Sequence, residues 1–118
     1  MIKLYNFAVI SIKCTSNNTL ITAMNFKGSV IFSCSNGFLG IKGSKRSSLY
    51  ASQNLGYFVG KKLHFLGFKY TYVKLKGLGF GRFTCLKGIY YSGLRILYIS
   101  DTTKFAYNGC KKPKARRL

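Results

Sequence analysis

This chain has a single carboxylate side chain and a large excess of cationic ones. Asp101 is the only acidic residue among 118, whereas twenty residues are Lys or Arg, which gives a formal net charge of +19. Six of the twenty cations lie in residues 102–118, so residues 1–101 carry fourteen. Such a chain cannot neutralise itself with internal salt bridges, and its self-repulsion disfavours the compact state. We therefore expect a polyanionic partner, with nucleic acid first and an anionic membrane surface second.

The shortage of carboxylates also limits the chemistry open to the chain. Paired-carboxylate hydrolysis, two-metal phosphoryl transfer and calcium sites each need several acidic side chains. The sequence has no CxxC pair, and His64 is its only histidine. This spacing argues against a zinc site and favours buried, idle thiols. We expect no catalytic residue, metal, cofactor or small-molecule substrate, and we expect unreactive thiols at Cys14, Cys34, Cys85 and Cys110.

The apolar start of the chain does not have the pattern of a targeting or membrane segment. It is interrupted by Asn6 and closed by Lys13, and no small-residue cleavage site follows. No run approaches the roughly eighteen apolar residues that a membrane span needs. We expect a soluble protein, made in the compartment where it works and not bound to a membrane.

Apolar periodicity and turn residues predict one α/β domain over residues 1–101. Gly28 suits the positive-φ position of a turn within an opening three-stranded meander. Gly56 and Gly60 weaken the prediction of the first helix by about 1 kcal/mol each relative to alanine. Alternatively, because they lie one helical turn apart, they would let this helix approach the sheet closely. The predicted order is β-β-β-α-β-α-β, a mixed five-stranded sheet with two helices, with strands at 7–14, 19–24, 29–34, 69–76 and 94–100 and helices at 49–65 and 82–92.

Helical spacing identifies the side chains expected to point into the core. The Phe and Tyr residues could stack on bases, but most of them alternate with polar residues in the strands and are interpreted as core. His64, near the end of the first helix, is interpreted as a surface residue. The inward residues expected from the two helices are Ala51, Leu55, Val59, Leu63, Leu66, Leu86, Ile89 and Tyr90.

The glycine-rich segment 77–82 lies between a predicted strand and a predicted helix and superficially resembles a dinucleotide-binding fingerprint. Arg82 stands where that fingerprint has its third glycine, and 118 residues leave no room for a full cofactor domain. Gly77, Gly79 and Gly81 would still let backbone amides and the helix start approach an anion, and Arg82 adds a charge. A tight β–α turn without a ligand is the alternative.

A second basic stretch precedes the first predicted helix. Its three cations and three serines converge just before the helix start, where the helix dipole disfavours cations unless an external phosphate fills the site. A solvated basic loop is the alternative. Asn17 and Asn18 lie in a turn and could contact RNA, although a plain turn explains them equally well. Lys27, in the next turn, is also predicted to contact RNA. The stretch is Lys42-Gly43-Ser44-Lys45-Arg46-Ser47-Ser48.

The last seventeen residues, 102–118, are predicted to form an extended basic arm. Pro113 and an Asn-Gly pair break any regular periodicity, and the segment cannot bury enough apolar surface to fold alone. A polyanion would order it; a solvated charged end is the alternative. The residues expected to contact RNA are Lys104, Asn108, Gly109, Cys110, Lys111, Lys112, Lys114, Arg116 and Arg117.

Five motifs, in this order, resemble the family of small-subunit ribosomal protein eleven. The resemblance covers roughly residues 7–118 and implies a ribonuclease-H-like fold without nuclease activity. It implies binding of small-subunit rRNA on the platform, near the mRNA exit and the E site. Small-subunit proteins seven, eighteen and twenty-one are the implied neighbours, with mRNA nearby. The motifs are Asn17-Asn18-Thr19, Gly40-Ile41-Lys42-Gly43-Ser44-Lys45-Arg46-Ser47, Lys76-Gly77-x-Gly79-x-Gly81-Arg82, Asp101-Thr102-Thr103 and Asn108-Gly109-Cys110-Lys111-Lys112-Pro113-Lys114.

The chain departs from the pattern of that family in its prolines. Leu49, Leu78 and Lys112 each stand where the family has proline, and residues 104–107 replace a Pro-Ile-Pro-His segment, so the arm should be less preorganised. Enrichment in Phe, Tyr, Ile, Lys and Asn indicates a mitochondrial ribosome, with a plastid or a bacterial cytoplasmic ribosome as alternatives. Two rival functions stay open: another RNA-binding or nucleotide-binding protein using segment 77–82, and a cationic membrane-surface protein.

Overall fold

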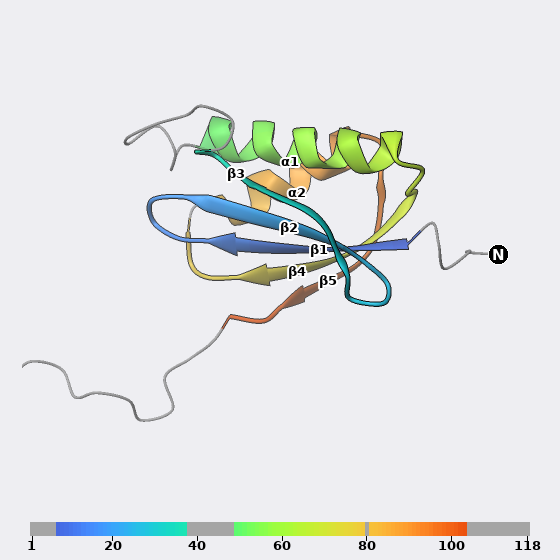
Figure 1. Ribbon diagram of the computed structural model, residues 1–118. Helices are drawn as coiled ribbons and strands as arrows, with labels where there is room; N and C mark the ends of the chain where they lie inside the picture. The colour runs from blue at the N-terminus through green and yellow to red at the C-terminus, as the bar shows by residue number, and fades with distance from the viewer. Residues whose placement is uncertain (1–6, 38–48, 80, 104–118) are drawn as a thin grey trace, which may run out of the picture.

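The computed structural model describes residues 7–37, 49–79 and 81–103 (Figure 1). Five strands and two helices follow one another in the predicted order, so the prediction of an α/β domain with a mixed five-stranded sheet is confirmed. The predicted bounds are met at the first strand and the first helix and differ by one residue elsewhere. The elements are β1 (Phe7–Cys14), β2 (Thr19–Asn25), β3 (Val30–Ser35), α1 (Leu49–Phe65), β4 (Tyr70–Lys76), α2 (Arg82–Tyr91) and β5 (Arg95–Asp101).

The sheet has the strand order β3-β2-β1-β4-β5. β1, β2 and β3 form an antiparallel meander, because two short turns connect them. In the second turn Gly28 has φ of 93°, as predicted, and the Asn25 side chain accepts hydrogen bonds from the backbone of Lys27 and Ser29. β4 and β5 return through α1 and α2 and pair parallel to β1 and to each other. The carboxyl ends of β1, β4 and β5 therefore meet at one end of the sheet.

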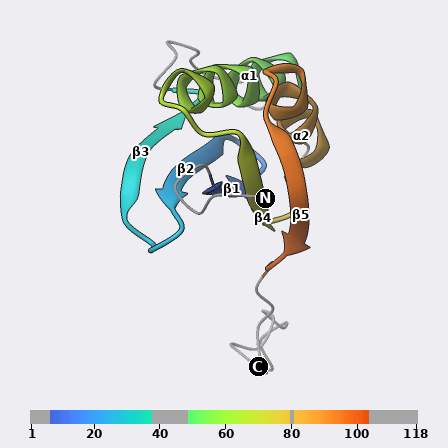
Figure 2. The ribbon, with the colours of Figure 1, turned by 90° about the vertical axis from the view of Figure 1, so that its right-hand side faces the viewer.

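Both helices lie on the same side of the sheet (Figure 2). Ala8, Ile10 and Ile12 of β1 are fully buried beneath them, and alternate residues of β2 and β4 are buried in the same way. The helix periodicity predicted most of the inward residues correctly. It was wrong for Leu66, which follows the last residue of α1 and is 50% exposed, and for Tyr90, which is 66% exposed. Tyr90 points outward because the preceding residue of this short helix, Ile89, occupies the inward position.

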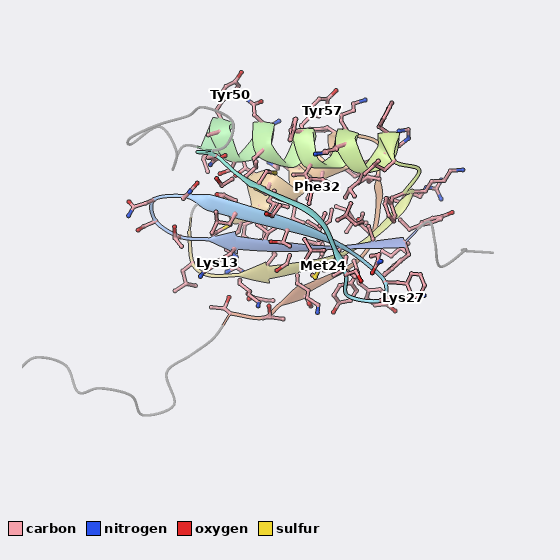
Figure 3. The ribbon with its side chains drawn as sticks, in the orientation of Figure 1. Lys13, Met24, Lys27, Phe32, Tyr50 and Tyr57 are labelled. Atoms are coloured by element: carbon pink, nitrogen blue, oxygen red, sulfur yellow. The ribbon has the colours of Figure 1, made fainter. Side chains whose placement is uncertain are left out.

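The aromatic residues lie mostly outside the core, which corrects the prediction that they build it. No Phe or Tyr in the described part of the chain is fully buried; Phe32 and Phe68 pack against the core only in part. Tyr50 and Tyr57 of α1 point away from the sheet (Figure 3). Among the described residues no second layer covers the outer surfaces of α1 and α2, so even large rings there are exposed.

The two helices pack closely against each other through glycine. A Cβ atom added at Gly56 would overlap the backbone carbonyl of Cys85 in α2, and one added at Gly88 would overlap the backbone carbonyl of Gln53 in α1. At Gly60 the added atom would overlap the side chain of Ser92. The prediction of a close approach by α1 was therefore right, but the neighbour it approaches is α2 and not the sheet.

Candidate nucleic-acid interface

The candidate interface lies where the carboxyl ends of the three parallel strands meet. Lys13, near the end of β1, pairs in register with Lys76, the last residue of β4. Asp101, the last residue of β5, lies beside the end of β4. The turn that holds Asn17 and Asn18 follows β1 directly, and α1 begins at the same end of the molecule (Figure 1). Parallel pairing thus brings together segments that are about sixty residues apart in the sequence.

The glycine loop after β4 packs tightly onto the end of β1. The Gly77 backbone N–H donates to the Thr103 hydroxyl over 3.2 Å, and the Gly79 N–H donates to the Cys14 carbonyl over 3.3 Å. A Cβ atom at Gly77 would overlap that same carbonyl, and one at Gly79 would overlap the carbonyl of Thr15. These two glycines are therefore needed for a close backbone approach, and their amides bond within the protein rather than being free to bind an anion.

The first turn of α2 presents a helix start together with a guanidinium group. Gly81 is the N-cap residue and supplies no capping side chain. It lies against the Ser52 and Thr19 hydroxyls, which share a hydrogen bond of 3.1 Å. The Arg82 side chain is only 16% exposed, and within the described residues its Nε and the Thr84 hydroxyl find no hydrogen-bond partner. Helix dipole and guanidinium together favour negative charge at this point.

The sole acidic side chain is bonded to neighbouring residues of the protein. The Asp101 carboxylate accepts hydrogen bonds from the Thr103 hydroxyl and the Thr103 backbone N–H, and it forms an ion pair with Arg82. The Thr103 hydroxyl first, and Arg82 second, lower the pKa of Asp101 to about 2. The Thr102 N–H donates to the Leu75 carbonyl over 2.7 Å. The chain is thus held at the end of the sheet as far as residue 103.

Two lysines that were not among the predicted RNA contacts flank a pocket at this end. Lys13 and Lys76 lie on the side of the sheet that the helices leave uncovered, since the residues next to them, Ile12 and Leu75, point into the core. The period-2 alternation of β1 and β4 indicated on which side of the sheet each lysine lies. Only the parallel pairing of the strands brings the two lysines together. The pocket is lined by Lys13, Cys14, Thr15, Lys76, Gly77 and Thr103.

The structure gathers the described site residues at this end, apart from one. Asn17 is exposed, and the Asn18 side chain accepts a hydrogen bond of 2.8 Å from the Thr19 N–H, as a turn residue does. Lys27 lies in the β2–β3 turn at the opposite end of the sheet, beside the start of β1 (Figure 3). The residues brought together are Asn17, Asn18, Gly77, Gly79, Gly81 and Arg82.

The other predicted contacts lie outside the described residues, but both segments that hold them join the fold at this end. The Asn36 N–H donates to the Thr19 carbonyl over 3.3 Å, so the chain leaves β3 here and returns to begin α1 here. Thr103 likewise ends the described chain beside Gly77. The residues outside are Lys42, Gly43, Ser44, Lys45, Arg46, Ser47, Lys104, Asn108, Gly109, Cys110, Lys111, Lys112, Lys114, Arg116 and Arg117.

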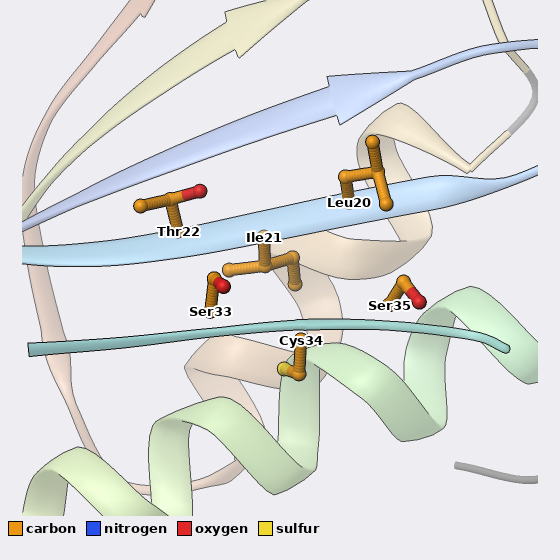
Figure 4. A pocket seen from close by; sticks show the side chains of 6 residues that line it. All are labelled: Leu20, Ile21, Thr22, Ser33, Cys34 and Ser35. Carbon is orange, nitrogen blue, oxygen red and sulfur yellow. The ribbon is translucent and has the colours of Figure 1, made fainter. Parts of the chain in front are cut away.

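The buried thiols and an uncharged pocket of the described residues add nothing to this interface. Cys14, Cys34 and Cys85 are buried free thiols, as predicted, and burial raises the pKa of each, that of Cys34 to about 11. Within ranges 7–37, 49–79 and 81–103, no group of His, Cys, Asp and Glu side chains could hold a metal ion, and no helix could span a bilayer. A pocket between β2 and β3 has no charged lining (Figure 4): Leu20, Ile21, Thr22, Ser33, Cys34 and Ser35.

Comparison with known proteins gives a consistent result. A family model described as "Ribosomal protein S11" matches residues 8–117. The small ribosomal subunit protein uS11m of Prototheca wickerhamii is 39% identical over 93% of this chain and 86% of its own length. The uS11c protein of Tupiella akineta is 39% identical over 93% and 85%, and the uS11 protein of Desulfotalea psychrophila is 39% identical over 93% and 87%.

Proposed function

The chain belongs to the ribosomal protein S11 family, and from that premise we propose that it binds small-subunit rRNA through the end of the sheet described above. Membership of the family supports a structural role in the small ribosomal subunit, and the family is generally non-enzymatic. The proposal adds that rRNA is the polyanion that screens the charge of +19, and that no reaction is catalysed.

One observation carries this proposal: cations and a helix start gather at one end while the only acid is neutralised there. Arg82 forms an ion pair with the Asp101 carboxylate and Thr103 donates a hydrogen bond to it, so its negative charge is compensated within the protein. Lys13 and Lys76 add two ammonium groups beside the pocket at the strand ends. Binding would release counterions from the RNA as these groups neutralise phosphates. Residues 38–48 and 104–118 would add further cations from the same end.

The location within the ribosome is part of the same proposal. Family resemblance supports the platform, near the mRNA exit and the E site, with small-subunit proteins seven, eighteen and twenty-one as neighbours. Relatives named uS11m, uS11c and uS11 agree with the expected mitochondrial ribosome and with its plastid and bacterial alternatives. If Lys27 also binds rRNA, the RNA must reach the opposite end of the sheet as well.

A nucleotide-binding site at segment 77–82 has less support. Gly77 and Gly79 donate their amides within the protein, and both lie against the backbone at the end of β1. A loop packed in this way leaves little backbone to cradle the phosphates of a cofactor.

The test measures binding of the full-length chain to a small-subunit rRNA fragment over a range of salt concentrations. The logarithm of affinity should fall linearly with the logarithm of salt, with a slope of about 0.7–0.9 per phosphate contacted. The double variant Lys13→Ala/Lys76→Ala should reduce this slope by about 1.4–1.8. Lys87→Ala, which removes an exposed cation from α2, is the matched control and should change neither slope nor affinity beyond twofold. A flat salt response of the unaltered chain would contradict the proposal.

A further inference from the structure

The helices leave one side of the sheet uncovered, and we call its side chains the open face. Thr71, Val73 and Leu75 of β4 are buried toward the helices, so the alternate residues of this strand point the other way. In register with them, Val9 of β1 lies beside Tyr72, and Tyr98 of β5 lies on the other flank of Tyr72. The open face includes Val9, Ser11, Lys13, Thr22, Met24, Tyr70, Tyr72, Lys74, Lys76, Tyr98 and Ser100.

Two tyrosine rings pack against each other on the open face. The ring centroids of Tyr72 and Tyr98 are 5.9 Å apart, with an interplanar angle of 36°. The Tyr72 hydroxyl donates to the Ser100 hydroxyl over 3.1 Å, which fixes the inner ring of the pair. Tyr98 is 67% exposed, so its ring is available to a partner. Tyr98 is therefore an exposed ring that packs against a second, hydrogen-bonded ring. Unpaired bases stack on exposed aromatic rings of this kind.

Cations accompany this pair and continue toward the candidate interface. The Lys74 ammonium lies 5.9 Å from the centroid of the Tyr72 ring. Lys76 follows two residues later on the same strand, about 7 Å further on, and Lys13 is its neighbour on β1. Asp101 does not oppose them, because its carboxylate is bonded to Arg82 at the start of α2, on the helix side. Among the described residues the open face therefore holds cations and no carboxylate.

We propose that the open face binds a single-stranded segment of RNA, with one base stacked on Tyr98 and the backbone following Lys74, Lys76 and Lys13. This inference rests on the proposed function and adds a second, sequence-tolerant contact to it. Unpaired nucleotides fit better than a duplex, because paired bases stay stacked inside a helix and cannot reach the ring. The run of cations without a carboxylate favours a polyanion over a protein surface of mixed charge.

The test uses the full-length chain with a decamer of oligouridylate and, for comparison, a ten-base-pair RNA duplex. Tyr98→Ala should weaken binding of the decamer about 5- to 100-fold, which is the effect of removing one stacking side chain. The salt slope should stay unchanged, since no cation is lost. Tyr98→Phe should keep the affinity within twofold. Tyr90→Ala is the matched control: Tyr90 is 66% exposed, nearly the same as Tyr98, but lies on α2. Lys74→Ala should lower the slope by about 0.7.

The outcomes separate this inference from the proposed function. If Tyr98→Ala binds the decamer as tightly as the unaltered chain, while Lys13→Ala/Lys76→Ala still weakens rRNA binding, the open-face contact is wrong and the proposed function stands. If Tyr98→Ala keeps its affinity for the decamer but fails to join a reconstituted small subunit, the open face docks a protein and the inference is overturned. If the unaltered chain shows no salt-dependent binding to rRNA, the proposed function fails.

Discussion

Arg82, the first residue of α2, forms an ion pair with Asp101, the last residue of β5. This pair joins the helix that follows the glycine loop to the strand that precedes the C-terminal residues. Thr103 completes the contact, because its hydroxyl donates to the carboxylate and accepts from the Gly77 backbone N–H. The only acidic side chain of the protein therefore links three segments of the candidate interface.

Acid titration should reveal how much Asp101 contributes to the stability of the fold. Its pKa is 3.8 as an isolated group and about 2 in the fold, so its stabilising effect is complete above pH 3.8 and is lost as the pH falls through 2. We expect the urea midpoint to fall over this window and Asp101→Asn to remove most of that fall. The unaltered chain and the variant share every other carboxyl group, the α-carboxyl included, so the difference between their titrations reports Asp101. An equally steep fall of the urea midpoint in Asp101→Asn would show that another group causes the loss of stability.

The glycine contact between the helices should make Gly56→Ala destabilising. In an exposed helix this change would stabilise by about 1 kcal/mol. Here the added methyl overlaps the Cys85 backbone, and we expect a net loss of about 1–3 kcal/mol in urea unfolding. Asn54→Ala, at an exposed position of the same helix, is the control and should stay within about 0.5 kcal/mol.

Gly60 allows a rescue experiment, because the obstacle there is a side chain. Gly60→Ala should destabilise the fold, since the new methyl overlaps Ser92. Adding Ser92→Gly removes that obstacle, and the double variant should be more stable than the sum of the two single effects predicts. The double-mutant cycle in urea measures this coupling. Simple additivity would show that the two helices separate to accommodate the methyl group.

Two glycines with similar backbone angles should respond differently to alanine. Gly28 has φ of 93° and Gly77 has φ of 91°, but only Gly77 lies against backbone atoms. Gly28→Ala should cost about 1–2 kcal/mol from the left-handed conformation alone. Gly77→Ala should cost about 2–5 kcal/mol, because the overlap with the Cys14 carbonyl is added. Equal losses in thermal unfolding would mean that the loop moves away from β1 easily.

The buried thiols should be protected from alkylation. Burial raises the pKa of Cys14, Cys34 and Cys85, so each stays a neutral thiol at pH 8. Iodoacetamide should modify them only after unfolding, as peptide mapping by mass spectrometry can measure. Stability should fall as the pH rises through about 9, because the unfolded thiols lose their protons before the folded thiols do. Rapid modification of the folded chain at any of the three would contradict this.

The sequence predicted element order and bounds well, because local patterns determine them. The alternation of β1 and the helical spacing of Ala51, Leu55, Val59 and Leu63 indicated which faces are buried. Gly56 and Gly60 indicated that α1 packs closely, but spacing along one helix cannot say which neighbour it meets. The burial of the aromatic residues was predicted wrongly, because hydrophobic character alone does not reveal that the described part of the chain has no second layer to cover them.

The site was predictable only where it is local in sequence. The turn at Asn17 and the loop ending at Arg82 have their own signatures in the chain. The pairing of Lys13 with Lys76, by contrast, depends on parallel strands that are distant in the sequence, as does the Tyr72–Tyr98 pair. Such contacts follow from topology rather than from any motif.

The attachment of two basic segments to one end of the sheet has a consequence for affinity. Hydrogen bonds of Asn36 to Thr19 and of Thr103 to Gly77 fix the points from which residues 38–48 and 104–118 continue. Once either segment holds a polyanion, the other meets the same molecule at a high effective concentration. Two contacts then act as one chelating contact, and cutting the chain after residue 103 should weaken binding by the ratio of that effective concentration to the dissociation constant of the severed piece.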